Sequence, residues 1–304
     1  MVSQRSWGLV FLMAAPLGWA VPPDGNAQIR ARAGDSDLIL TTTSRLAGAI
    51  DSLKWDGKEF INSTDHGRQL QSACSFDNTK TANAETFNPT EAGSRRDHSG
   101  TNSTSRLLEI SARGKQLQTK TQMAFWLAPG ERSAGQLARN TNTLSNYILT
   151  KDVTIGFDRW PQALDYRVTF SVPANAHHVF AQFETLTGYL AAEFSTFYQF
   201  NSQTGKLEPL SAGPGEIKNP VVLATPDGKY AMGIFAPPQH QLNPASYGRW
   251  KFSEAQVVKW NCVARVRNSE GIRPGNYTYR MLVPVGSVVQ VETMLREWQS
   301  IQWP

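Results

Sequence analysis

Alternation between apolar and polar residues runs along most of the chain, which is typical of β-strands with one buried face. Three segments show it well, "LDYRVTFSV" (164–172), "VVKWNCVARVRN" (257–268) and "NYTYRMLVPVG" (276–286), and all are rich in β-branched or aromatic residues. Turn residues recur at about every ten to fifteen positions, a spacing typical of large antiparallel sandwiches. The pattern predicts an all-β fold.

Paired apolar runs around turn residues predict β-hairpins at three places. The expected pairs are Ile50–Trp55 with Lys58–Ile61, Arg106–Ala112 with Gln116–Leu127, and Pro220–Thr225 with Tyr230–Ala236. The first pair flanks Asp-Gly, a dipeptide that favours the tight turns of hairpins.

Helical periodicity is clear in one segment only, "VVQVETMLREWQSI" (288–301), where Val291, Met294, Leu295 and Trp298 recur at helical spacing. No proline- or serine-rich linker and no internal repeat divides the chain. We therefore expect one domain over residues 21–304, a large twisted antiparallel β-sandwich with a short C-terminal helix.

The first twenty residues have the pattern of a secretory signal peptide. Arg5 precedes an apolar run from Trp7 to Ala15, and Gly18 and Ala20 are small residues before a cleavage point. The run is shorter than the roughly 20 apolar residues that span a bilayer. An uncleaved anchor is the alternative. We predict a signal peptide over residues 1–20, secretion to the extracellular space or periplasm, and no membrane partner.

If the protein is exported, its Asn-x-Ser/Thr sequons could be glycosylated and its two cysteines could form a disulfide. Asn62, Asn102 and Asn276 begin Asn-x-Ser/Thr sequons and are candidate N-glycosylation sites in a eukaryotic secretory pathway. Cys74 and Cys262 are candidates for a disulfide in an oxidising compartment, and two separate buried thiols are the alternative.

Composition narrows the function classes. The net charge of +5 is spread along the chain without a lysine/arginine run, so we expect no nucleic-acid partner. A mildly basic surface would favour an anionic substrate such as a uronic-acid polysaccharide. The alternative is that the charge contributes only to solubility. Nine tryptophans are many for 304 residues. Their faces stack on sugar rings or pack in the core.

Two bursts of polar residues, Asp65–Gln69 and Glu91–His98, lie within one 38-residue stretch, Ser63–Gly100. The first burst contains His66, a candidate acid or base, and Arg68 and Gln69, whose donors suit hydroxyls or a carboxylate. In the second burst, Glu91 and His98 are candidates for an acid/base pair. Solvated loops with local ion pairs are the alternative.

Candidates later in the chain rest on strand geometry. Gln182 and Glu184 alternate along "FAQFET" and share one face of a predicted strand, where they could line a concave sheet for a sugar or simply face solvent. His178 directly precedes this strand. Arg249 and Trp250 place a guanidinium beside an indole, which could bind a ligand. An ordinary loop at the rim of the sheet is the alternative.

Several catalytic motifs are absent from the sequence: the Gly-x-Ser-x-Gly elbow, His-Glu-x-x-His, the phosphate loop and the EF-hand loop. The spacing of Asp65, His66, Asp97 and His98 does not single out a metal site. We predict neither a cofactor nor a metal.

The segments "AGAIDSLKWDGKEFINSTDHGRQLQ" (47–71) and "HHVFAQFETLTG" (177–188) resemble the galactose-mutarotase-like, or supersandwich, group over about the first two-thirds of the chain. The resemblance implies that Gly67-Arg68 begins a substrate-binding region and that His178 is the strand histidine of the acid/base pair. The chain departs from mutarotases after Arg68, where Gln-Leu-Gln replaces their usual Asn-Arg. The scaffold also resembles domains of polysaccharide lyases and glycoside hydrolases.

These observations favour a secreted carbohydrate-active enzyme that cleaves a glycosidic bond by acid/base chemistry, as a hydrolase or a lyase. The proposed catalytic residues are His66, Glu91 and His98, and the substrate-binding residues are Arg68, Gln69, His178, Gln182, Glu184, Arg249 and Trp250. An aldose epimerase and a non-catalytic carbohydrate-binding protein are the alternatives.

Overall fold

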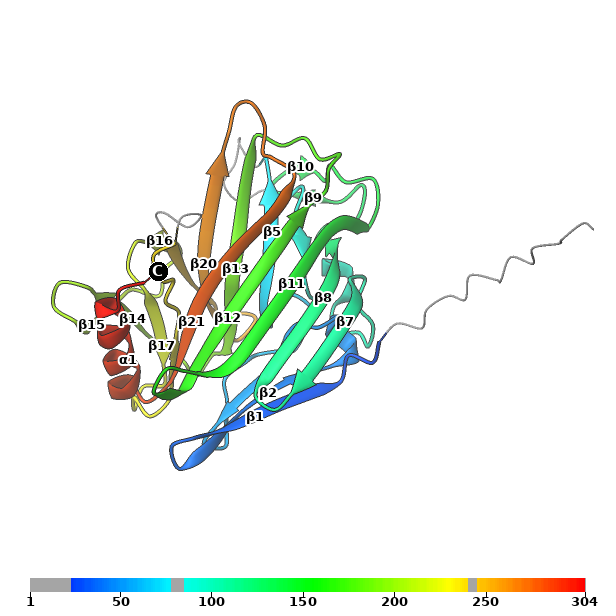
Figure 1. Cartoon of the computed structure of the whole chain (residues 1–304). Helices are drawn as coiled ribbons and strands as arrows, with labels where there is room; N and C mark the ends of the chain where they lie inside the picture. The colour runs from blue at the N-terminus through cyan, green and yellow to red at the C-terminus, as the bar shows by residue number, and fades with distance from the viewer. Residues whose placement is uncertain (1–22, 78–84, 240–244, 304) are drawn as a thin grey trace, which may run out of the picture.

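The computed structural model describes residues 23–77, 85–239 and 245–303, so the predicted signal peptide lies outside the described residues. Two layers of antiparallel strands form the body of the protein (Figure 1). The predicted all-β sandwich is confirmed.

The first layer contains, in pairing order, β7 (Arg106–Arg113), β8 (Gln116–Phe125), β11 (Leu144–Phe157), β12 (Trp160–Val172), β21 (Gly275–Gly286), β18 (Ala231–Gly233), β17 (Val221–Ala224), β14 (Thr196–Asn201) and β15 (Lys206–Pro209). The second layer contains β1 (Ala27–Ala33), β2 (Ser36–Thr42), β3 (Ile50–Trp55), β5 (Leu70–Phe76), β13 (Phe180–Ala191), β20 (Val257–Arg267), β19 (Ser246–Phe252) and β16 (Gly215–Ile217).

Short elements connect or extend these layers. The strand β4 (Lys58–Glu59) pairs with β3, and β6 (Pro89–Thr90) pairs with both β5 and β8, which joins the two layers. The strands β9 (Arg132–Ser133) and β10 (Gln136–Leu137) form a separate ribbon. Two 3₁₀ turns span Ser44–Leu46 and Arg95–Asp97.

The hydrophobic core lies between the layers, where the buried faces of the alternating strands meet. Phe170 of β12 and Phe183 of β13 pack with ring centroids 4.9 Å apart, and the Tyr166 hydroxyl lies 2.9 Å from Ser72 Oγ across the interface. Inward-facing residues of one layer thus contact those of the other, as in other face-to-face sandwiches.

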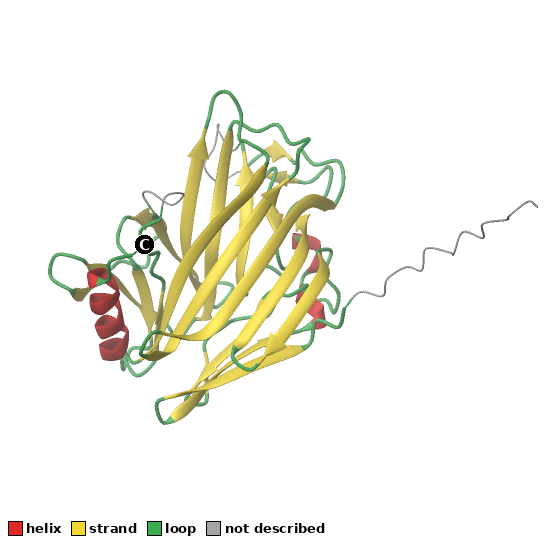
Figure 2. Ribbon diagram, in the orientation of Figure 1, coloured by secondary structure: helices red, strands yellow, loops and turns green. Residues whose placement is uncertain are grey.

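The C-terminal helix α1 (Val288–Ser300) confirms the predicted helical periodicity, because Val291, Met294, Leu295 and Trp298 are all buried. They pack on an apolar cluster at one side of the sheets (Figure 2). Ser287 caps the helix by accepting a hydrogen bond from the Gln290 backbone N–H. The three predicted hairpins are present as β3–β4, β7–β8 and β17–β18.

The candidate disulfide is not formed: Cys74 on β5 and Cys262 on β20 are free, buried thiols. The two strands are not neighbours, because β13 lies between them and pairs Phe183 with Cys74 and Leu186 with Cys262. Burial raises the pKa of both thiols, that of Cys262 to about 12, which keeps them protonated and unreactive.

Two of the three sequons lie at exposed positions, Asn102 in a loop and Asn276 at the start of β21. The Asn62 side chain instead accepts hydrogen bonds from the backbone and hydroxyl of Thr64. Across the described residues, no helix is both long and apolar enough to cross a membrane.

Candidate functional site

A row of polar side chains lies on the face of the second layer that points away from the core. Glu184 and Tyr189 come from β13, and Lys259 comes from the neighbouring β20. Residues 184 and 189 are an odd number of positions apart and would face opposite sides of a regular strand. A β-bulge solves this: Glu184 pairs with Val263 and Leu186 pairs with Cys262, so Thr185 is the extra residue.

Lys259 is the centre of this group. Its Nζ lies 3.2 Å from Glu184 Oε2, and it is 5.1 Å from the centroid of the Tyr189 ring. Glu184 Oε2 also accepts a hydrogen bond of 2.8 Å from the Thr187 hydroxyl. The Glu184 side chain keeps 24% of its surface exposed, whereas that of Lys259 keeps 11%. Solvent therefore reaches the carboxylate more than the ammonium.

The surroundings keep Glu184 ionised. Burial by itself would raise the pKa of this carboxyl, but the positive charge of Lys259 and a hydrogen bond from Thr187 outweigh it. The net result is a pKa below the ordinary value of 4.5. Burial also raises the pKa of the Tyr189 phenol. Here burial outweighs the positive charge of Lys259, which lowers the pKa, so the net pKa is raised and the hydroxyl stays protonated.

Trp250 of β19 pairs with Lys259 of β20, so its indole lies on the same face. The ring is 4.9 Å from Lys259 Nζ, a cation–π geometry. A Cβ atom on Gly248 would lie only 2.0 Å from Trp250 Cη2, so the glycine makes room for the indole. The predicted partner Arg249 does not join Trp250, because neighbouring strand residues face opposite sides and Arg249 donates to Ser211.

Tyr189 also lines a cleft with a volume of about 370 Å³. The cleft is lined by Asp65, His66, Gly67, Arg68, Glu85, Arg95, His98, Trp126, Tyr189, Phe252, Ala255 and Val257. Residues from both polar bursts of the sequence line it together with three aromatic rings. This mixture of aromatic faces and polar groups suits a sugar.

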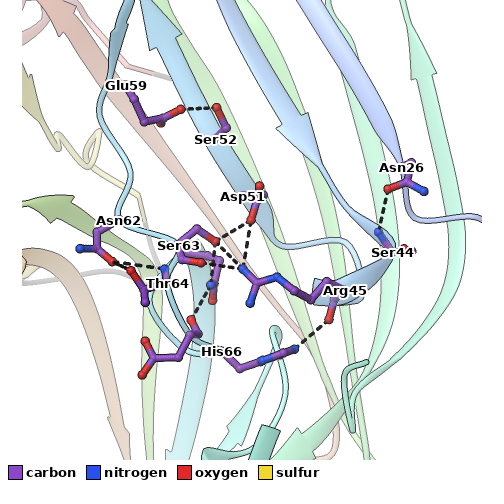
Figure 3. A network of polar contacts seen from close by, with 12 residues as sticks. Asn26, Ser44, Arg45, Asp51, Ser52, Glu59, Asn62, Ser63, Thr64 and His66 are labelled. Carbon is purple, nitrogen blue, oxygen red and sulfur yellow. Dashed lines mark hydrogen bonds and ion pairs between the residues drawn. The ribbon is translucent and has the colours of Figure 1, made fainter. Parts of the chain in front are cut away.

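The two polar bursts meet through His66. Its backbone N–H and its Nδ1 both contact the carbonyl oxygen of His98 at 2.7 Å, and its Nε2 lies 2.8 Å from the carbonyl oxygen of Arg45. Figure 3 shows this histidine beside Arg45, whose guanidinium contacts Asp51 and Ser63. Both ring nitrogens are therefore engaged with the backbone, and the geometry gives His66 the role of holding two loops together.

Gly67 brings the first burst close to an aromatic wall of the cleft. Its φ angle is +89°, and a Cβ atom there would lie 2.8 Å from Trp126 Cζ3. Glycine is suited to both the left-handed backbone and the close approach. The neighbouring Arg68 and the exposed His98 line the cleft, so these two predicted site residues remain candidates for contact with a ligand.

Each cation around the cleft already has a carboxylate partner. Arg68 Nε lies 3.1 Å from Asp65 Oδ1, and Arg95 lies 3.4 Å from Glu131. Lys259 is paired with Glu184, as described above. An anionic ligand would have to compete with these ion pairs, so the arrangement favours a neutral one.

Glu85 differs from Glu184 in its electrostatic setting. Glu85 is an exposed residue, but it also lines the cleft, where desolvation raises the pKa of its carboxyl above the ordinary 4.5 and the negative charge of Glu184 adds to this. Lys259 and a hydrogen bond from Trp126 oppose the increase without cancelling it. The two carboxyl groups thus belong to one electrostatic cluster and have pKa values displaced in opposite directions.

The predicted catalytic residue Glu91 lies elsewhere. It is fully buried in the sandwich and forms an ion pair with Lys151, which is also fully buried. Glu91 Oε2 accepts from the Ser72 backbone N–H at 3.1 Å, and Lys151 Nζ donates to the Gly48 carbonyl at 2.6 Å. Neither side chain is among the residues that line the cleft, and the contacts of Glu91 give it a structural role.

Six of the predicted binding residues are not among those that line the cleft: Gln69, His178, Gln182, Glu184, Arg249 and Trp250. Gln69 is buried and donates to Ser63 Oγ and to the Asp65 carbonyl, which shapes the first burst. Gln182 shares the face of Glu184, as the alternation indicated, but its Oε1 accepts from Arg265. His178 is buried between the layers, at the other end of β13 from Tyr189.

Within the described residues, no three His, Cys, Asp or Glu side chains gather as metal ligands. The cleft lining offers carboxyl, phenol, imidazole and guanidinium groups.

Sequence reasoning missed Glu85, Tyr189, Lys259 and Trp126. Lys259 had a signal, because it is a polar residue at an outward position of the alternating segment "VVKWNCVARV". Tyr189 had none, because the bulge that brings it to the face of Glu184 is set by strand pairing. Glu85 and Trp126 lie in connections outside the named strands.

No family model matches this chain, and no curated protein matches it in sequence. Among solved structures, the chain is similar to a candidate aldose 1-epimerase from Escherichia coli K12 (12% identity, 86% of this chain and 100% of that one, TM-score 0.46). It is also similar to an α-galactosidase from Lactobacillus brevis (9% identity, 88% and 40%, TM-score 0.45).

A heparan sulfate lyase HepC mutant from Pedobacter heparinus is similar as well (8% identity, TM-score 0.45), over 90% of this chain and 37% of the lyase. The similar structures thus include the group that the sequence resembles, together with carbohydrate-cleaving enzymes. Since all three TM-scores are below 0.5, we argue the function from the side chains of this chain.

Proposed function

We propose that this chain is a carbohydrate-active enzyme that hydrolyses a glycosidic bond of a neutral sugar. Glu85 is the proton donor, and Glu184 stabilises the positive charge that develops at the anomeric carbon. The observation that carries the proposal is the placement of Glu85 on the cleft lining, in one electrostatic cluster with Glu184, which is paired with Lys259. In this cluster the pKa of Glu85 is raised and that of Glu184 is lowered. Such a pair supplies one acid and one carboxylate under the same conditions.

The two roles follow from the surroundings of each group. A raised pKa keeps Glu85 protonated further above pH 4.5, so it can donate to the leaving oxygen. A lowered pKa keeps Glu184 ionised, and an ionised carboxylate stabilises an oxocarbenium-like transition state. Tyr189, which lines the cleft and interacts electrostatically with both carboxyl groups, provides a hydroxyl for a sugar hydroxyl.

A neutral substrate is supported by the ion pairs around the cleft. The cations of Arg68, Arg95 and Lys259 each face a carboxylate of the protein. A lyase needs a uronate and a free cation to neutralise it, so these pairs support hydrolysis over elimination. The faces of Trp126 and Phe252 offer stacking surfaces for an uncharged ring.

An aldose epimerase is the second candidate, because the same acid and carboxylate could open and close a free sugar ring. The specific observation in its favour is the cleft volume of about 370 Å³, which is near the lower end of ligand sites and suits a single sugar unit.

Product chemistry separates these reactions. The purified protein is incubated with neutral oligosaccharides, with uronate-containing polysaccharides and with freshly dissolved α-D-galactose. New reducing ends from the neutral substrates, without the ultraviolet absorbance of an unsaturated uronate, are expected. Absorbance growth on uronate polymers would indicate a lyase, and accelerated change of optical rotation alone would indicate the epimerase. Inactivity in all three assays would refute the proposal.

A further inference from the structure

Three side chains form a continuous hydrogen-bonded chain between the two layers, and none of them is among the residues that line the cleft. Asp77 follows β5, His178 precedes β13 and Tyr147 lies on β11. His178 Nδ1 lies 2.7 Å from Asp77 Oδ2, and His178 Nε2 contacts the Tyr147 hydroxyl. Asp77 Oδ1 accepts from the backbone N–H groups of Val179 (2.8 Å) and Phe180 (3.1 Å).

These contacts fix the direction of the hydrogen bonds. Desolvation would raise the pKa of Asp77, but its bonds from His178 and from two backbone N–H groups outweigh that effect and lower it. The ionised carboxylate accepts a proton from Nδ1, so Nε2 carries the lone pair that accepts from the Tyr147 hydroxyl. The imidazole is also stacked on Phe76 with ring centroids 4.3 Å apart, which holds its orientation.

A carboxylate, an imidazole and a hydroxyl in this order form the arrangement in which a hydroxyl becomes reactive without being ionised at rest. Burial raises the pKa of Tyr147, so its hydroxyl keeps its proton until a reaction partner arrives. The proton then has an acceptor in His178 Nε2, and the resulting imidazolium has a counter-charge in Asp77.

The chain of residues opens onto a cavity of about 310 Å³. Tyr147 and His178 line it together with the rings of Phe87 and Phe125 and the amide of Asn140. Asn140 is only 5% exposed, and its Nδ2 donates to the carbonyl oxygens of Leu127 and Asn142, both at 2.9 Å, which fixes the amide at the cavity wall.

This cavity is separate from the cleft of the proposed function. Phe125 and Trp126 are adjacent in the chain, yet Phe125 lines the cavity and Trp126 lines the cleft. The two spaces share no lining residue.

We propose that the cavity is a second ligand site, for a hydroxyl-bearing molecule the size of one sugar unit, in which Tyr147 backed by His178 and Asp77 is the reactive hydroxyl. A ligand hydroxyl bonds to Tyr147 Oη, and the rings of Phe87 and Phe125 cover the apolar face of the ligand. This site goes beyond the proposed function and does not depend on Glu85 or Glu184.

Benzenesulfonyl fluoride tests the reactivity of Tyr147. Its phenol oxygen attacks sulfur, the O–S bond forms, the S–F bond breaks with release of fluoride, and the phenol proton passes to His178 Nε2. Peptide mass spectrometry should find Tyr147 labelled at least about tenfold faster than the partly exposed Tyr198, because a positioned base contributes roughly 10²–10⁴-fold. Equal or slower labelling of Tyr147 in the wild-type protein would overturn the proposal.

Variants and ligands complete the test. His178→Gln and Asp77→Asn should each lower labelling of Tyr147 by at least about tenfold, while His177→Gln, the same change at the exposed neighbour, should not. Unchanged labelling in Asp77→Asn or in folded His178→Gln would contradict the relay. D-galactose or D-galacturonic acid should protect Tyr147, and absence of protection by both would refute the sugar-sized ligand. Glu85→Gln should leave labelling unchanged, which separates this site from the cleft.

Discussion

The buried ion pair of Glu91 and Lys151 gives a prediction about stability. The sequence pattern alone assigned Glu91 to catalysis instead. We consider Lys151→Met, which keeps the length of the side chain and removes its charge. Both side chains of the pair are fully buried, so the variant leaves a carboxylate in the sandwich with one remaining hydrogen bond, from the Ser72 backbone N–H.

Removal of one partner of a buried pair costs about 3–5 kcal/mol. At roughly 2–4 °C per kcal/mol for a domain of this size, the melting temperature should fall by roughly 6–20 °C. The assay is urea unfolding followed by the fluorescence of the tryptophans, with the free energy of unfolding taken from the midpoint and the slope.

Lys120→Met is the matched control, since Lys120 pairs with Glu109 at 2.9 Å on an exposed surface. This variant should lose at most about 1 kcal/mol. The double variant Glu91→Leu, Lys151→Met should lose clearly less than the two single losses added together, because no charge is left unpaired. A loss below about 1 kcal/mol in Lys151→Met, or additive losses, would refute the reasoning.

Three other outcomes are expected. Gly248→Ala should displace the Trp250 ring, since the new Cβ would lie 2.0 Å from it, and should change the near-ultraviolet circular dichroism; an unaltered spectrum would contradict that packing. Turnover should fall as pH drops through the lowered pKa of Glu184 and as it rises through the raised pKa of Glu85, and a flat profile across the acidic range would argue against both roles. Mass spectrometry of the exported protein should find Val21 as its first residue, and an intact residue 1 would contradict a cleaved signal.

The strand pattern and the helix could be predicted from sequence because each depends on local periodicity. Alternation placed Gln182 and Glu184 on one face, and a 3.6-residue period identified the buried side of α1. The hairpin at Asp56-Gly57 could be read from its turn dipeptide.

The site depended on information that no local window contains. Glu91 lies in a polar stretch, yet its partner Lys151 is 60 residues away and lies on another strand. Tyr189 reaches the face of Glu184 only because the pairing of β13 with β20 contains a bulge. The thiols of Cys74 and Cys262 stay apart because a third strand lies between them, and sequence spacing does not show this.

The polar bursts themselves were a partly correct indication. They meet at His66 and His98 and line one cleft, as their density in a single stretch suggested. His66, however, contacts backbone carbonyl oxygens through both ring nitrogens. The carboxyl groups with displaced pKa values belong to Glu85 and to the strand residue Glu184, which lie outside the bursts.

The rate of sugar release by Glu85→Gln tests the central proposal most directly. On the neutral oligosaccharide that the wild-type protein cleaves best, this variant should be slower by at least ~100-fold, because it lacks the proton donor. Glu109→Gln, the same change at an exposed glutamate of β7, should keep the wild-type rate. A Glu85→Gln rate within about threefold of wild type would contradict the assignment of Glu85 as the acid.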